Sequence, residues 1–130
     1  MKQFVTLITI LILATSLCRA EGFELTGKAE SYTAKVTFLE GQPVKGSNRV
    51  RIDIVDSSSR HVTDAQVGVE YLMPSLPGKP PMMDYHTTAK RAGAAYETTL
   101  KIDMTGEWKI VLSITRMKHT EKVTVAFLVK

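Results

Sequence analysis

Cysteine is almost absent from this chain of 130 residues, and the single one, Cys18, lies near the N-terminus. One cysteine cannot close a disulfide within the chain, so a hydrophobic core must hold the fold together. Aromatic residues are also few, at 7% of the chain, whereas hydrophobic residues of all kinds reach 44%. This length and composition predict one domain with a mainly aliphatic core.

Sequence signatures of enzymes are missing. The chain has no G-x-S-x-G elbow, no H-E-x-x-H and no C-x-x-C. Residues 41–47 have the two glycines of a phosphate loop, but the lysine that should follow the second glycine is absent. The three histidines, His61, His86 and His119, are far apart in sequence, and the carboxylates fall on polar strand faces or in turns. We therefore expect that the protein is not an enzyme.

A long hydrophobic run occurs only at the N-terminus. Lys2 precedes an apolar-to-neutral run over residues 4–17, and a small residue, Ala20, follows Arg19. This is the layout of a secretory signal peptide over residues 1–20. Cleavage after Ala20 would leave residues 21–130 as one domain of modest size. The removed segment holds two cations and no acid, so the net charge would fall from +4 to +2.

Two other interpretations of the leader stay open. In an uncleaved anchor, the 16 residues between Lys2 and Arg19 would cross a membrane, although a spanning helix needs about 20. In a lipoprotein, Cys18 would be acylated, although bulky Leu17 precedes it. Every version places residues 21–130 in the periplasm or otherwise outside the cytoplasm, with membrane attachment only if the leader is retained. That location and the lack of a dense basic stripe argue against nucleic acid as a partner.

Period-two alternation of apolar and polar residues runs through residues 21–130, which carry no sustained helical stripe. Val50, Ile52 and Ile54 form one such apolar face. The alternation predicts strands over residues 32–39, 49–55, 65–72, 96–103, 108–115 and 122–130, with a weaker seventh over 85–90. Strands buried on both faces would be more continuously apolar. We therefore predict an all-β fold, an immunoglobulin-like β-sandwich of about seven antiparallel strands without a disulfide.

The segment Asp-Met-Thr-Gly-Glu-Trp at residues 103–108 is typical of the corner where such a chain crosses between sheets. Trp108 enters the next strand there, and Ile110 stands where an antibody domain would have cysteine. Apolar burial is expected to replace the covalent link. A buried Trp108 should find a partner for its indole N–H.

Methionine and proline are concentrated in residues 69–86. Prolines favour a stiff, extended loop that does not pair. The thioethers of Met73, Met82 and Met83 and the imidazole of His86 suit Cu(I), a soft ion. Met82 and His86 are expected to converge with Met73 across the loop, and Met104 is a further candidate from the corner. These five residues are the predicted metal ligands.

A structural interpretation of the same residues stays open. Methionine often fills gaps in cores, and Met73 ends an apolar strand face. His86 would then be an ordinary surface residue, and Lys79 in the loop disfavours a cation. Met117 and His119 form a second Met-x-His pair, which we interpret as a solvated turn.

Three segments resemble the YtkA-like domain family and the related FixH-type extracytoplasmic domain. They are Leu-Met-Pro-Ser-Leu-Pro-Gly at residues 72–78, Gly-Ala-Ala-Tyr-Glu at 93–97 and Met-Thr-Gly-Glu-Trp-Lys-Ile at 104–110. The similarity spans roughly residues 25–130, and the corner motif is its most specific part. The resemblance implies an immunoglobulin-like fold, a bacterial envelope location and an association with copper handling or copper-oxidase assembly.

The sequence departs from the family pattern within the loop. Members with the richest loops carry methionine or histidine after the Met-Pro-Ser element, where this chain has Leu76 and Lys79. Two functions are therefore expected as alternatives. The first is a copper-binding or copper-oxidase-assembly accessory protein of the periplasm, with Cu(I) as its ion and a copper protein or envelope complex as its partner. The second is a module that binds a protein through the Met/Pro loop, without metal.

Overall fold

The computed structural model describes residues 22–74, 78 and 83–130. The predicted signal peptide, with Cys18, lies outside these residues, so it stays a prediction. The described chain forms eight strands, β1 (Phe23–Lys28), β2 (Tyr32–Phe38), β3 (Gly46–Asp56), β4 (Gln66–Met73), β5 (Met83–Ala92), β6 (Ala95–Ile102), β7 (Gly106–Arg116) and β8 (His119–Val129). All the pairings are antiparallel, as predicted. The described residues contain no helix that is long and apolar enough to cross a membrane.

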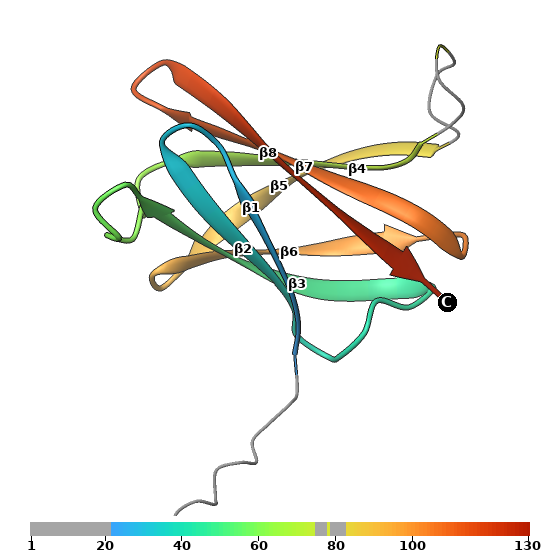
Figure 1. Cartoon of the computed structure of the whole chain (residues 1–130). Coiled ribbons are helices and arrows are strands. Elements are labelled where there is room, and N and C mark those ends of the chain that lie inside the picture. Colours follow the sequence, from blue (N-terminus) through green and yellow to red (C-terminus); the bar gives the residue numbers. More distant parts are fainter. Residues whose placement is uncertain (1–21, 75–77, 79–82) are drawn as a thin grey trace, which may run out of the picture.

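The strands follow one continuous order, β1-β2-β3-β6-β5-β4-β7-β8, which folds over itself into two facing layers (Figure 1). Strand β5 joins the layers by changing partner along its length. Its first part pairs with β4, from Met73↔Met83 to Val67↔Ala89. Its last three residues pair with β6, up to Ala92↔Ala95. The predicted sandwich is therefore present as two layers of a nearly closed sheet.

Strand β1 is the element that the sequence-based prediction omitted, which gave seven strands rather than eight. Its inward-facing positions are Phe23, Leu25 and Gly27, all only partly buried. Two apolar side chains and a glycine make a weak alternating pattern. Pairing with β2, from Phe23↔Phe38 to Lys28↔Thr33, and packing against the core establish the strand instead. Tertiary context outweighs local pattern here.

The core lies between the two layers and consists of the predicted apolar faces. Aliphatic side chains dominate it, and Trp108 is its largest fully buried member. The chain crosses between layers from β6 to β7 at residues 103–105, as predicted. Nε1 of Trp108 donates to the carbonyl oxygen of Met104 at 2.9 Å, which confirms the expected indole partner. The corner and the core are thus linked through one side chain.

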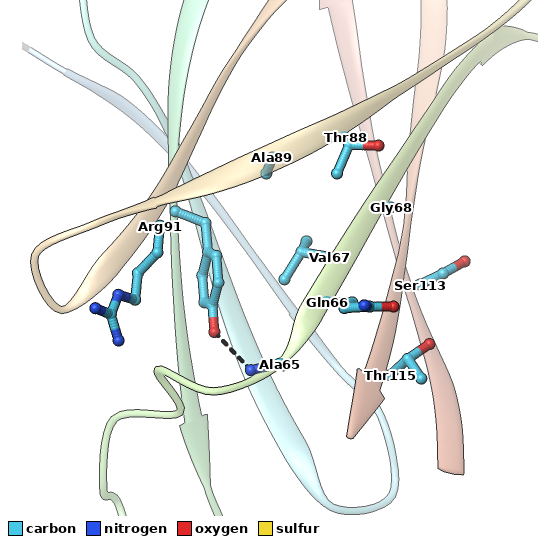
Figure 2. A pocket seen from close by; sticks show the side chains of 10 residues that line it. Ala65, Gln66, Val67, Gly68, Thr88, Ala89, Arg91, Ser113 and Thr115 are labelled. Carbon is cyan, nitrogen blue, oxygen red and sulfur yellow. Dashed lines mark hydrogen bonds between the residues drawn. The ribbon is translucent and has the colours of Figure 1, made fainter. Parts of the chain in front are cut away.

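Two tyrosine hydroxyls connect the layers, one on each side of the point where β5 changes partner. The hydroxyl of Tyr71 in β4 accepts a hydrogen bond from the backbone N–H of Lys101 in β6 at 3.1 Å. In the opposite direction, the hydroxyl of Tyr96 in β6 accepts from the N–H of Ala65 at 3.0 Å (Figure 2). A strand lacking a backbone neighbour leaves its N–H groups in need of acceptors. Each tyrosine supplies one such acceptor from the other layer.

The substitution Tyr71→Phe should therefore leave the backbone N–H of Lys101, but not that of Ala65, without its acceptor. We expect a loss of about 1 kcal/mol in unfolding free energy, because one partly buried N–H loses its acceptor. Amide hydrogen exchange should accelerate at Lys101 and stay unchanged at Ala65, while Tyr96→Phe should give the reverse. Equal acceleration at both amides in either variant would contradict this pairing of hydroxyls and amides.

Candidate functional site

The end of the molecule where β4 stops and β5 starts carries most of the predicted ligands. Met73 is the last residue of β4 and pairs in register with Met83, the first residue of β5. Met82 lies outside the described residues, so its position as a ligand stays a prediction. The register nevertheless fixes where the backbone enters and leaves the Met/Pro segment. Met73 and Met83 lie on neighbouring strands at this end.

Met104 lies at the same end of the molecule, in the corner between β6 and β7. Met73 is 7% exposed, and its terminal methyl lies next to Gly106, at the end of the corner that contains Met104. A Cβ placed on Gly106 would lie 3.1 Å from Met73 Cε, so glycine keeps room for this thioether. Gly106 also has a φ of 126°, which disfavours other residues. Met104 itself is 37% exposed. The structure therefore brings Met73 and the Met104 corner together.

Three aromatic rings pack beneath this end. Tyr85 stacks on Trp108 with ring centroids 6.4 Å apart and an interplanar angle of 17°. Tyr71 lies 5.3 Å from Tyr85 and 6.2 Å from Trp108, measured between centroids. The Tyr85 hydroxyl donates to Oδ2 of Asp103. That hydrogen bond raises the pKa of Tyr85 above its ordinary value, since the neutral phenol is the donor. The aromatic rings are thus joined to the corner at residues 103–105 through Asp103 and the carbonyl of Met104.

His86 does not join the methionines. Side chains alternate across a strand, and His86 lies on the exposed outer face of β5, whereas Met73 points into the core. The expected convergence of His86 with Met73 is therefore not found. His86 instead pairs across the strands with Glu70. Its Nε2 lies 3.4 Å from Oδ1 of Asp84 and 3.9 Å from Oε2 of Glu70.

Glu70 and Asp84 share this outer face and interact with each other. A side-chain hydrogen bond with Asp84, together with desolvation, raises the pKa of Glu70 above its ordinary value. The Glu70 side chain is 29% exposed, whereas that of His86 is 70% exposed. The sequence placed Asp84 and His86 on one face through their spacing. It gave no signal for Glu70, because only the β4–β5 register brings that residue opposite His86.

Met117 and His119 occupy the β7–β8 hairpin at the other end of β7. Met117 is 93% exposed, and both it and Lys118 have positive φ, at 52° and 68°. His119 Nε2 lies 3.2 Å from Oε2 of Glu121. The Met117–His119 pair is an exposed hairpin turn, as expected.

Glu121 is a buried residue near the start of β8, next to this hairpin. Its carboxylate makes the stability of the fold depend on pH. Hydrogen bonds from Ser31, including its N–H at 2.8 Å, hold the pKa of Glu121 below its ordinary value. A lowered pKa in the folded state adds stability above the ordinary pKa of glutamate, about 4.3, and that stability is lost as pH falls through the folded pKa.

Glu121→Gln should therefore reduce unfolding free energy at pH 7, and the difference from the native protein should shrink at pH 3. Denaturant unfolding at the two pH values measures this difference, with the exposed Glu107→Gln as a control without the Ser31 bonds. A difference that stays constant between the two pH values would contradict the role of the ionised carboxylate.

A hollow of about 530 Å³ lies near the first residues of β4, away from the methionines. It opens where β5 leaves β4, over Gly68 and between Thr88 and Ser113 (Figure 2). Arg91 is the cation on its wall, and its Nη1 donates to the carbonyl of Thr63 at 3.3 Å. None of the lining residues is a histidine, a methionine or an acid. The hollow therefore contains none of the predicted ligands.

Comparison with known proteins gives a family and a similar fold. Residues 26–113 match the model of the YtkA-like family. Among solved structures, the soluble domain of PmoD from Methylocystis sp. (Rockwell) superposes with a TM-score of 0.57 at 14% sequence identity. The match covers 82% of this chain and 97% of the PmoD chain. At that identity the similarity concerns the fold. No curated protein matches the chain.

Proposed function

The chain belongs to the YtkA-like family, and on this basis we propose that it is an exported, non-enzymatic domain that binds Cu(I) and delivers it to a copper protein or copper-oxidase complex of the envelope. The observation that carries the proposal is the approach of the Met73 side chain to the corner that contains Met104. Met73 packs against Gly106 beside Met104, and Met83 starts the strand paired with Met73. Met82 directly precedes that strand. Copper handling is also what the family resemblance implies.

The chemistry of these side chains supports a transfer role. Thioethers are soft ligands that favour Cu(I) over hard cations. They form no disulfides, so a site without cysteine suits the oxidising compartment to which an exported protein goes. Met104 is 37% exposed and Met73 is nearly buried. A site with one accessible ligand could release its ion to a partner, whereas a fully enclosed site would retain it.

A module that binds a protein through the Met/Pro loop, without metal, is the second candidate. A hollow of about 270 Å³ beside Pro74 favours it. Phe127, Ala126 and the half-exposed Leu128 line this hollow with Pro74, and Glu107 and Lys109 stand at its edge. Apolar surface at the end of a sandwich, next to a loop, is a common setting for partner binding.

A Cu(I) titration separates the two functions. The protein is titrated under reducing conditions against a chromophoric Cu(I) chelator at micromolar concentration. We expect one retained Cu(I), with affinity lowered about tenfold or more, or about 1.4 kcal/mol, in Met82→Ala, Met83→Ala and Met104→Ala. Met117→Ala, at the distant hairpin, is the matched control and should bind like the native protein. Failure of the native protein to retain copper would eliminate the copper function and favour the protein-binding module.

A further inference from the structure

The outer face of the β4–β5 pair carries a second set of possible ligands, separate from the thioethers. One ligating atom each from Glu70, Asp84 and His86 can be chosen so that all three lie within 4.8 Å of one another. His86 Nε2 lies 3.4 Å from Asp84 Oδ1 and 3.9 Å from Glu70 Oε2. Two adjacent strands hold these side chains, because Glu70 and His86 are cross-strand partners and Asp84 precedes His86 by two residues.

These separations are close to those in a metal coordination shell. Oxygen and nitrogen ligands bind Zn²⁺ at about 2.0–2.2 Å, so two ligands at a tetrahedral angle are about 3.4 Å apart. The Asp84–His86 separation of 3.4 Å already has this value, and the Glu70–His86 separation of 3.9 Å exceeds it by about 0.5 Å. The side chains of Asp84 and His86 are 39% and 70% exposed, which leaves them free to adjust. Exposure also gives an ion direct access from solvent.

The donors determine the class of ion. Two carboxylates give the group negative charge, which favours a cation, and this outweighs the opposing positive charge that Lys122 of β8 exerts on Glu70 in addition to His86. Magnesium and calcium prefer oxygen ligands alone, whereas imidazole suits zinc and copper. Three protein donors also leave a fourth position for water or for a ligand from a partner.

We propose that Glu70, Asp84 and His86 bind a divalent cation of the Zn(II) or Cu(II) class through two carboxylates and one imidazole. This site faces solvent, whereas Met73 points into the core from the same strand pair. The buried Met73 side chain is therefore separate from this set of three donors, and the inference does not require the Cu(I) function. A chain with both sites would hold a soft monovalent ion and a borderline divalent ion.

Calorimetric titration of the purified protein with Zn(II), repeated with Cu(II), tests the site. We expect one equivalent to bind, with at least a tenfold loss of affinity in His86→Ala and in Glu70→Gln. His119→Ala is the matched control, because His119 lies 3.2 Å from one carboxylate oxygen of Glu121 but belongs to no group of three donors in the described chain. Glu70→Gln preserves side-chain shape, and thermal melting of each metal-free variant shows whether it folds.

Three results would overturn the proposal: no binding by the native protein, unchanged affinity in folded His86→Ala and Glu70→Gln, or an equal loss in His119→Ala. The methionine variants keep the two proposals apart. Met82→Ala and Met83→Ala should bind Zn(II) like the native protein, even if Cu(I) binding is lost. A Zn(II) signal that disappears with Met82 or Met83 would also contradict an independent site.

Discussion

Trp108→Ala is expected to destabilise the protein by about 3–5 kcal/mol, the usual cost of removing a large aromatic side chain from a core. The ring is fully buried and stacks on Tyr85. Its loss would leave a cavity at the corner between β6 and β7. It would also remove the indole N–H that binds the Met104 carbonyl. Thermal melting should show a decrease of more than about 10 °C for a domain of this size.

Two further variants keep this result interpretable. Trp108→Phe retains an aromatic ring but lacks the indole N–H, so its loss should be smaller than that of Trp108→Ala and should be measurable even if the alanine variant does not fold. Leu128→Ala, at a half-exposed position on β8, should have little effect. An unchanged melting temperature in Trp108→Ala would contradict the burial of this ring in the core.

Gly27→Val is expected to have the second largest effect, a loss of about 2–3 kcal/mol from overpacking. Gly27 of β1 packs against β8, although the two strands are not neighbours in the sheet order. A Cβ at Gly27 would lie 2.6 Å from Val123 Cγ1 and 2.9 Å from Val125 Cγ1. Valine side chains have little rotamer freedom, so they cannot turn away. The added side chain must therefore push β1 from β8.

Gly68 provides the matched control for this prediction. It also lies in a strand, but a Cβ there would meet only Ser113 Cβ, at an ordinary 3.7 Å. Gly68→Ala should be neutral or slightly stabilising, because alanine reduces the entropy of the unfolded chain. Denaturant unfolding of both variants measures the difference. Equal effects of the two substitutions would indicate that the β1–β8 contact does not close the sheet.

The sequence predicted the fold well because burial has a simple periodic signature in strands. Alternation identified the inward faces of six strands and indicated β5 only weakly, and the corner motif located Trp108 and the crossing between layers. It omitted β1, where Gly27 takes the place of a third apolar side chain. Alternation also could not predict that β5 changes partner, because periodicity does not specify which strands become neighbours.

The candidate ligands were predicted less completely, because a site depends on contacts between distant segments. Spacing placed Met73 at the end of an inward face, and the corner motif singled out Met104. The alternation of side chains along a strand separates His86 from Met73, since His86 faces solvent and Met73 faces the core. Glu70 was missed because the pairing register of β4 with β5 decides which residue faces His86. Neither composition nor periodicity predicts the register between two strands.

X-ray absorption spectroscopy at the copper edge tests the central claim most directly, that the methionine end of this domain holds Cu(I). The protein is loaded with one equivalent of copper under reducing conditions and compared with Met82→Ala and Met83→Ala. The account predicts a Cu(I) edge with sulfur as the main neighbour, and fewer sulfur neighbours in the variants. A shell of nitrogen and oxygen alone, unchanged by both substitutions, would contradict it.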